Sequence, residues 1–570
     1  MTEETGIGPD KDALLRLIRD SVIGEDHVME TPYGRRRVTY ADYTASGRAL
    51  GFIEDFIRDQ VLPSYANTHT ESSGTGLQTT RLREEAREII REGVGGDADS
   101  VVIFAGSGCT AAIAKLIGIL GLRIPSALDD RHQLSDHIPP SERPVVFIGP
   151  YEHHSNDIPW RESIADVVTI RQDADGGADQ EDLREQLEKY AERPLKIGSF
   201  SAASNVTGIV SDTAGISTLL HEHGALSFWD FAAAAPYIDI DMVAVDPQRP
   251  LSYKDAIFLS PHKFIGGPST PGVLVARREL FSNRVPDVPG GGTVVYVNDD
   301  DHRYLDDPTH REEGGTPAII EAVRAGMVFQ LKQAVGTATI RAQEDRHLRR
   351  AVEAWSAVPS IELLGNLDAR RLSIVSFVVR SPSGRYLHHN FIVALLNDLF
   401  GIQSRGGCSC AGPYGHRLLG IDLERSHEFE REITGGCEGI KPGWVRVNLN
   451  YFVSDAVADY LVEAVALVAR DGWRLLGDYL FDTTTGRWRH RDGLVTPPLS
   501  LRDISYDGGI ASMPTNRATG GEELLVEHLR EGAAILAAAE GPDLSDHPAN
   551  LSADFEHLRW FDLPRECIRE

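Results

Sequence analysis

Short apolar runs alternate with amphipathic segments along the first 330 residues of the chain. The runs with the length and apolar content of buried strands are VVIFAGSG, PVVFIGPYEHH, KIGSFSAAS, ALSFWDF, DAIFLS and GVLVAR. The segments with helical spacing between them include REEAREIIREG, TAAIAKLIGIL, DLREQLEKYAE and TAGISTLLHEHG. Strands in alternation with helices predict an α/β fold with a doubly wound, mostly parallel sheet. The strands are largely apolar, which indicates that both faces of the sheet are covered.

The pattern changes after this region. Residues 331–479 begin with a long helical stretch and continue as an α+β pattern, which predicts a second, smaller domain. The large domain is therefore expected over 40–330, and residues 1–39 are expected to pack with the small domain. Residues 480–570 form a C-terminal extension of unknown role, with a helix predicted over 522–540.

Composition narrows the class of protein. A chain of 570 residues is long enough for two or three domains. Its 57 basic and 85 acidic side chains give a formal charge of −28, which argues against nucleic acid as a partner because phosphate binding needs clustered Lys and Arg. No apolar run reaches the length of a membrane helix, and the charged N-terminus lacks a signal-peptide core. The five cysteines suit a reducing compartment, so a cytoplasmic protein without a membrane partner is expected.

Residues that can bind a ligand or take part in a reaction follow the predicted strands. GSGCTAA at 106–112 leads from a glycine turn into a helix, whose N-terminus suits a phosphate. YEHHSN at 151–156 places two histidines at a strand end, and SNVTG at 204–208 adds an amide. The strand ALSFWDF ends near Asp230, and the strand DAIFLS ends shortly before Lys263. Taken singly, each piece is compatible with a turn, a cap or a structural side chain.

Together these pieces describe one ligand. A phosphate needs the helix N-terminus, a flat ring needs a histidine, a ring cation needs Asp230, and an aldehyde needs Lys263. Pyridoxal phosphate has all four groups, and a lysine Schiff base with an aspartate on the pyridine nitrogen is its usual protein environment. We therefore interpret Lys263 as the Schiff-base lysine.

The chain resembles the class-V aminotransferase family of fold-type I pyridoxal phosphate enzymes, with the greatest likeness to the cysteine desulfurase and selenocysteine lyase branch. The motifs that carry the resemblance are YADYTASG, NTHTESSG, EHHSN, SNVTG, the strand-ending aspartate, SPHK, EEGGTP, RGGCSCAGP and WVRVNLNYF. It covers residues 40–452 and implies a seven-stranded sheet of the fold-type I kind, with a smaller α+β domain. It also implies a homodimer, because EEGGTP matches a segment that serves the neighbouring subunit.

The resemblance implies a role for each matching residue. Around the cofactor, the residues at the phosphate would be Cys109, Thr110, Ser260 and His262. His153 would stack on the ring as a catalytic residue. Asn205 would lie near the ring hydroxyl and the substrate carboxylate. Thr316 would reach the phosphate of the neighbouring subunit. Arg446 would bind the α-carboxylate of the substrate, for which a planar guanidinium is well shaped.

The motif RGGCSC distinguishes a desulfurase from other enzymes of the same fold. In desulfurases a cysteine on a mobile loop takes the sulfur of the substrate and keeps it as a persulfide, and Cys410 matches that position. Cys408 matches a position that often holds a histidine, and its contribution stays open. Glycines 406 and 407 would let the loop swing. A zinc site is a weaker alternative, because the spacing of Cys408, Cys410, His416 and Cys437 fits no common pattern; no metal is expected.

The predicted function is removal of sulfur or selenium from L-cysteine or a related amino acid, with a sulfur acceptor as partner. One alternative is an epimerase, a C–S lyase or an aminotransferase of the same fold, which would not need Cys410. Another is a non-enzymatic protein that binds the cofactor or carries sulfur. Ala233 departs from the family, which often has a glutamine there. Insertions near 123–143, 286–311 and 426–443 would cap the site or select another substrate.

Overall fold

The computed structural model describes residues 9–68, 70–244, 246–493, 497–514, 517–545 and 551–568. Its centre is a seven-stranded sheet in the order β4-β10-β9-β8-β7-β5-β6. The strands are β4 (Ser100–Ala105), β5 (Val145–Ile148), β6 (Asp166–Thr169), β7 (Lys196–Ser201), β8 (Leu226–Asp230), β9 (Ala256–Leu259) and β10 (Gly272–Arg277). Only β10 pairs antiparallel with its neighbours, β4 and β9, so the mostly parallel α/β sheet of the prediction is confirmed.

Helices cover both faces of this sheet, and the strands are apolar for that reason. Along β4, Val101 and Ile103 face one hydrophobic core, while Val102 and Phe104 face the other. The helices of this part are α2 (Gly51–Phe56), α3 (Gly74–Gly93), α4 (Gly108–Ile119), α6 (Ile158–Arg161), α7 (Gln180–Lys189), α8 (Thr213–Glu222) and α9 (Pro308–Arg311). The predicted helices correspond to α3, α4, α7 and α8.

The sequence pattern missed one strand of the sheet. β6, with the sequence DVVT, lies at the edge and pairs only with β5. Its residues are half-buried or exposed, unlike the fully buried neighbour β5. An edge strand needs fewer apolar residues, and so the run is too short and too polar to stand out.

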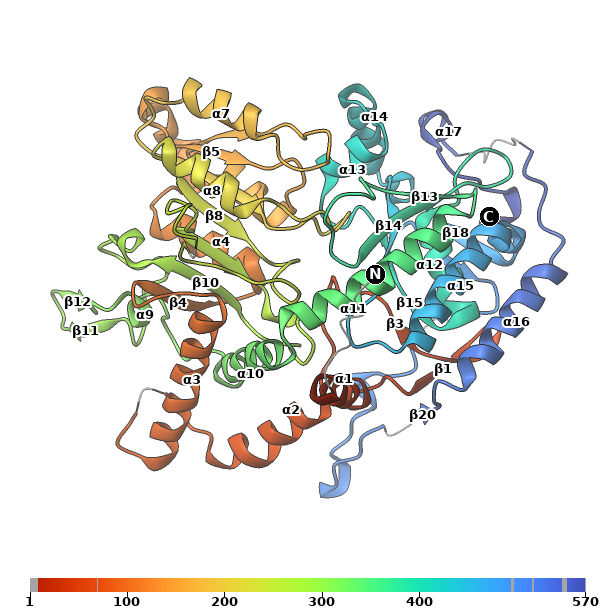
Figure 1. Cartoon of the computed structure of the whole chain (residues 1–570), viewed down its shortest axis with the longest axis horizontal. Helices are drawn as coiled ribbons and strands as arrows, with labels where there is room; N and C mark the ends of the chain where they lie inside the picture. The colour runs from red at the N-terminus through yellow and green to blue at the C-terminus, as the bar shows by residue number, and fades with distance from the viewer. Residues whose placement is uncertain are drawn as a thin grey trace.

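A smaller sheet forms the second part of the chain, with the order β13-β14-β17-β16. Its strands are β13 (Ile361–Leu363), β14 (Ile374–Val379), β16 (Arg405–Gly407) and β17 (Trp444–Asn448). The helices around it are α10 (Ile319–Val335), α11 (Thr337–Ser356), α12 (His389–Phe400), α13 (Gly412–Leu418), α14 (Leu423–Thr434) and α15 (Asp455–Asp471). In Figure 1, α10 and α11 lie between the seven-stranded sheet on the left and the smaller sheet on the right.

Both ends of the chain meet this second part. α1 (Pro9–Ser21) leads to β1 (His27–Thr31) and β2 (Gly34–Arg37), and β1 also pairs with β20 (Ala518–Thr519). β3 (Thr39–Tyr40) pairs with β15 (Ile402–Gln403). The C-terminal elements are β18 (Tyr479–Asp482), β19 (Arg487–His490), α16 (Leu524–Ala538) and α17 (Ala553–Leu558). α16 confirms the helix predicted for the extension and runs along the right-hand edge in Figure 1.

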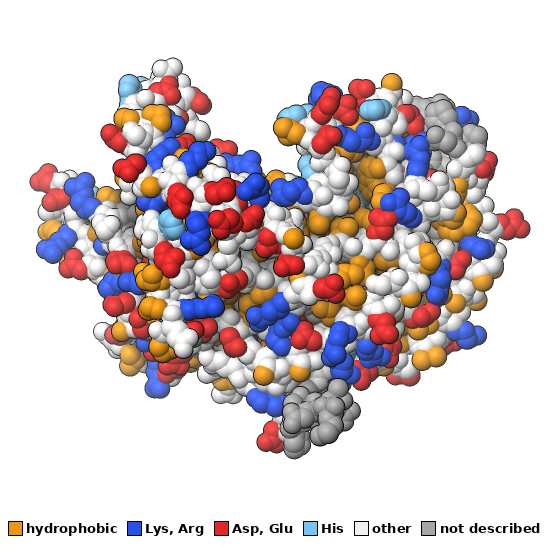
Figure 2. Space-filling view, turned by 45° about the horizontal axis from the view of Figure 1, so that its top comes forward, with side chains coloured by type: hydrophobic (Ala, Val, Ile, Leu, Met, Phe, Trp, Pro, Cys, Tyr) orange, Lys and Arg blue, Asp and Glu red, His pale blue; other side chains and the backbone are white. Residues whose placement is uncertain are grey.

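Two insertions fold into small elements of their own. α5 (Ser126–His132) lies in the first, and a hairpin of β11 (Val294–Val297) and β12 (His302–Tyr304) lies in the second and projects at the left in Figure 1. Acidic and basic side chains are interspersed on the face shown in Figure 2, so the negative charge is not gathered into one patch there. Within the described residues, no helix is both long and apolar enough to cross a membrane.

Candidate functional site

A cavity of about 870 Å³ lies where the parallel strands end. The carboxyl ends of β4, β5, β7, β8 and β9 share one edge of the sheet, and ligand sites of α/β sheets form at such edges. The predicted site residues that line the cavity are Cys109, Thr110, His153, Asn205, Asp230, Ser260, His262, Lys263, Cys410 and Arg446. Thr316 is not among the lining residues, although its neighbours Pro317 and Ala318 are.

Asp230 and Lys263 lie on the cavity wall at the ends of adjacent strands. Asp230 is 4% exposed, and its Oδ1 accepts a hydrogen bond from the backbone N–H of Ala232 at 2.7 Å. Burial raises the pKa of Asp230, against the opposing effects of that hydrogen bond and of Lys263. Burial also lowers the pKa of Lys263, with Asp230 opposing. The pair thus offers a buried acid and a readily deprotonated amine to one ligand.

The N-terminus of α4 forms a cradle for an anion. Ser107 at its N-cap makes no side-chain capping bond, and the backbone N–H of Cys109 donates to Ser260 Oγ at 2.9 Å. A Cβ atom on Gly272 would lie 1.9 Å from the carbonyl oxygen of Gly108, so glycine is required for this close approach. The backbone N–H groups of the first helical turn and the positive end of the helix dipole suit a phosphate here.

His153 is held by its own loop as a neutral ring. Its Nδ1 accepts from the backbone N–H of Ser155 at 3.1 Å, which places the ring proton on Nε2. Burial, aided by the charge of Lys263, lowers the pKa of His153 to about 3. The side chain is therefore an uncharged flat ring at neutral pH.

Glu152 forms a buried hydrogen-bond network next to this histidine. Its carboxylate accepts from Ser201 Oγ at 2.6 Å, from the Ser201 N–H at 2.9 Å and from Asn156 Nδ2 at 2.7 Å. Burial raises the pKa of Glu152 to about 7, although these hydrogen bonds oppose the rise. The network ties the loop after β5 to the end of β7. Glu152 belongs to the motif EHHSN, and no local signal in the sequence indicated this role.

Arg446 is positioned by a carboxylate that the sequence did not single out. Its Nη2 donates to Asp42 Oδ1 at 2.8 Å, and its Nη1 donates to the carbonyl oxygen of Asn205 at 3.1 Å. The other oxygen of Asp42 accepts from Arg405 Nε at 3.0 Å. Two guanidiniums share one carboxylate, so the group keeps a net positive charge that suits a substrate carboxylate.

Residues Cys408–Ala411 form a tight turn, which we call the cysteine turn. The N–H of Ala411 donates to the carbonyl oxygen of Cys408 at 3.1 Å. The two central residues, Ser409 and Cys410, have φ angles of 50° and 55°. The left-handed region costs non-glycine residues about 1–2 kcal/mol each, so other contacts must hold the turn. Cys410 is exposed and lines the cavity.

Gly406 and Gly407, expected from the sequence to let the loop swing, differ in their surroundings: Gly407 has a φ of 114° and open space where a Cβ atom would lie, whereas Gly406 is closely packed. Both lie in β16, which pairs antiparallel with β17. A Cβ atom on Gly406 would meet Asn390 Oδ1 at 2.5 Å and His389 Cδ2 at 3.1 Å. At position 406 glycine therefore allows close packing of the strand on α12 rather than a swinging loop.

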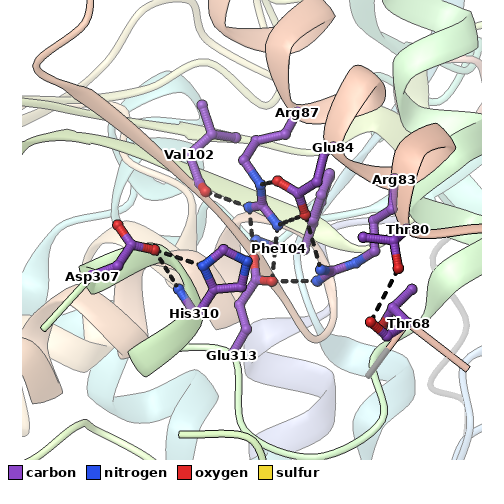
Figure 3. Close-up of polar contacts among 10 residues, drawn as sticks. All are labelled: Thr68, Thr80, Arg83, Glu84, Arg87, Val102, Phe104, Asp307, His310 and Glu313. Carbon is purple, nitrogen blue, oxygen red and sulfur yellow. Dashed lines mark hydrogen bonds and ion pairs between the residues drawn. The ribbon is translucent and has the colours of Figure 1, made fainter. Parts of the chain in front are cut away.

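EEGGTP is anchored to α3 by a buried ion-pair cluster, shown in Figure 3. The carboxylate of Glu313 lies between Arg83 and Arg87 and accepts from Arg87 Nη1 at 2.9 Å. It also accepts from the backbone N–H of Phe104 at 2.6 Å. Although burial alone would raise the pKa of Glu313, the two guanidiniums lower it to about 2. The carboxylate of Glu313 is thus charged and paired with both arginines, and these ion pairs fix the segment EEGGTP beside the cavity.

Thr316, further along this segment, accepts from Asn67 Nδ2 of the same chain at 3.2 Å. Asn67 belongs to NTHTESSG, so two motifs of the family resemblance meet here. The predicted contact of Thr316 with a neighbouring subunit stays a prediction.

The four residues of the alternative zinc set are not brought together. Among the described residues, no group of three or more His, Cys, Asp or Glu is placed to hold a metal ion. Cys408 packs instead against a cluster that includes Tyr151, Tyr414 and Trp444.

The fold and the cavity define a class of protein: an α/β protein in which a lysine and an aspartate at the carboxyl edge of a seven-stranded sheet line a cavity together with a cysteine that follows a strand of a second sheet. The family model for class-V aminotransferases matches residues 39–422. The chain belongs to the class-V aminotransferase family.

Similar proteins agree with this assignment. A probable cysteine desulfurase of Staphylococcus aureus is 27% identical over 398 residues, which are 69% of this chain and 88% of that protein. A probable cysteine desulfurase of Staphylococcus epidermidis is 27% identical over 414 residues, 72% of this chain and 91% of that protein. The structure of a cysteine desulfurase from Thermococcus onnurineus matches with a TM-score of 0.62 and 22% identity, over 82% of this chain and 99% of that one. The last likeness supports the fold.

Proposed function

We propose that the protein is a pyridoxal phosphate-dependent cysteine desulfurase, which moves the sulfur of L-cysteine or a related amino acid, or the selenium of a selenium analogue, to Cys410. The observation that supports this best is the cavity itself, because an exposed thiol lines it together with Lys263 and Asp230. The two staphylococcal relatives, which bear the same activity in their names, add support.

The residues of the cavity fit the cofactor. Lys263 would bind the aldehyde, Asp230 the ring nitrogen, His153 the ring face, and the N-terminus of α4 with Ser260 and His262 the phosphate. The fit rests on a carboxylate that is only 4% exposed and on the uncapped helix N-terminus, both of which line the cavity. When bound, the cofactor supplies a ring that accepts the electron pair left on the substrate α-carbon.

The other roles belong to side chains of the chain. Arg446 binds the substrate carboxylate and Asp42 orients the guanidinium. Lys263 takes the α-proton, which its lowered pKa favours because a neutral amine is a base. His153 stays neutral and packs on the flat face of the ligand.

Two thiols line the cavity, and only one of them is suited to attack sulfur. Cys109 is 4% exposed, and burial raises its pKa well above the usual value. Cys410 is exposed, and Arg405 and Arg446 line the same cavity. The reactive form of a cysteine is the thiolate, and attack on sulfur also requires an accessible side chain. In the balanced reaction, the thiol of Cys410 takes the sulfur atom of L-cysteine, the substrate becomes L-alanine, and Cys410 becomes a persulfide.

The setting of this reaction is also proposed. We place it in a homodimer, with Thr316 serving the partner's phosphate, and in the cytoplasm, because all five cysteines are free thiols. A sulfur-acceptor protein or small molecule takes the persulfide sulfur from the exposed Cys410.

Product analysis tests the proposal. The cofactor-loaded protein is incubated with L-cysteine, alanine is quantified, and persulfide is trapped by alkylation and mapped by mass spectrometry. We expect alanine and a persulfide on Cys410. Cys410→Ser should abolish both, whereas the matched control Cys408→Ser, whose side chain packs against aromatic residues, should retain them.

Other products would contradict the proposal. Pyruvate with ammonia would indicate a C–S lyase, and an inverted stereocentre would indicate an epimerase. Full activity of Cys410→Ser with the true substrate would exclude a persulfide on this residue.

A further inference from the structure

His154, the second histidine of EHHSN, contacts the cysteine turn and the residue directly after it, Gly412. Its backbone N–H donates to the carbonyl oxygen of Cys410 at 2.8 Å. Its ring Nε2 accepts from the backbone N–H of Gly412 at 3.1 Å. His154 follows a strand of the seven-stranded sheet, whereas the turn follows a strand of the smaller sheet. The two bonds therefore connect the two parts of the site.

Asn205 holds the neighbouring carbonyl group of the same turn. Its Nδ2 donates to the carbonyl oxygen of Ser409 at 2.8 Å, and its own carbonyl oxygen accepts from Arg446. Asn205 and His154, which lie in loops that follow strands of the seven-stranded sheet, thus bind the consecutive carbonyl groups of Ser409 and Cys410. The turn is bound from outside at its two central residues.

These contacts act on a backbone that would otherwise relax. Ser409 and Cys410 have φ angles of 50° and 55°, which L-residues rarely adopt. Such conformations persist when the surroundings over-determine them, and they cluster at functional sites. A relaxed turn would change the direction of the Cys410 side chain relative to Lys263.

We propose that His154 is a positioning residue that holds the cysteine turn in its left-handed form, so that the Cys410 thiol faces the cavity. The ring acts as a hydrogen-bond acceptor and is therefore neutral, with its proton on Nδ1. Burial lowers the pKa of His154, in keeping with that state. The inference rests on the proposed function and deepens it, because it explains how the thiol of Cys410 is directed into the cavity.

Hydrogen exchange measured by mass spectrometry on the cofactor-loaded protein tests this. His154→Ala removes the ring acceptor of Gly412, so peptides covering residues 408–415 should exchange about tenfold faster, with the rest of the chain unchanged. His154→Gln keeps an acceptor and should restore protection. The control is His137→Ala, which changes an exposed histidine at the end of the 3-10 helix Leu134–His137.

A second readout separates positioning from general stability. His154→Ala should slow persulfide formation on Cys410 severalfold with little change in KM for L-cysteine, and His154→Gln should recover the rate. Unchanged exchange in His154→Ala, or no rescue by His154→Gln, would overturn the proposal. If hydrogen exchange becomes faster along the whole chain of His154→Ala, the His154→Gln variant decides. Protection of residues 408–415 from exchange in that variant supports the proposal, and loss of protection in these residues alone refutes it. Absence of persulfide in the wild type would refute the desulfurase function instead. The two failures can be told apart because hydrogen exchange reports on the cysteine turn even when no reaction takes place.

Discussion

Replacing Glu313 by glutamine should destabilise the protein by about 3 kcal/mol at neutral pH. The pKa of this carboxyl falls from its ordinary 4.5 to about 2 in the fold, because Arg87 and Arg83 outweigh the effect of burial. Each pKa unit corresponds to about 1.36 kcal/mol, so the shift represents about 3 kcal/mol of preference for the charged form. Glutamine keeps the shape but removes the buried anion between the two guanidiniums, which then retain only the partly exposed Glu84 as a carboxylate partner (Figure 3).

Urea unfolding followed by tryptophan fluorescence measures this change. The matched control is Glu85→Gln, which removes an exposed partner of Arg81 on the same helix and should unfold close to the wild type. The lowered pKa also fixes the pH dependence. The wild type has this stabilisation above about pH 4.5 and loses it as the pH falls towards 2, so the difference between wild type and Glu313→Gln should shrink in acid. Equal midpoints for Glu313→Gln and Glu85→Gln at neutral pH would refute the reasoning.

Borohydride reduction of the cofactor-loaded protein should fix a pyridoxyl group on Lys263, and finding it on Lys254 or Lys115 would contradict the assignment. Asp230→Ala should abolish turnover because a ring without its anionic partner is a poorer electron acceptor, and normal turnover would remove this residue from the site. The ring of His153 should not titrate between about pH 5 and 8, since its pKa is lowered to about 3, and a midpoint near 6.5 in its NMR shifts would contradict the neutral ring. Light scattering should show a dimer, and a fully active monomer would argue against a shared site.

The strands and the main site residues could be predicted from sequence because their signals are local. A buried parallel strand needs a continuous apolar run, and the residue that follows it lies at the carboxyl edge of the sheet. GSGCTAA, EHHSN, SNVTG, Asp230 and SPHK all follow such runs, so their convergence could be expected from the order of residues alone. β6 was not predicted because an edge strand has little apolar surface to bury.

The contacts that hold the site depend on the tertiary structure. Asp42 and Arg446 are 404 positions apart, and His154 and Gly412 are 258 apart. No spacing rule connects such residues, because only the packing of the two sheets brings them together. The same limit explains the glycines: the sequence indicates flexibility at Gly406, whereas the neighbouring atoms of α12 show that the position has no room for a side chain. Sequence thus determined which residues have the chemistry and at which edge they gather, and tertiary packing decided which partners set their charge and direction.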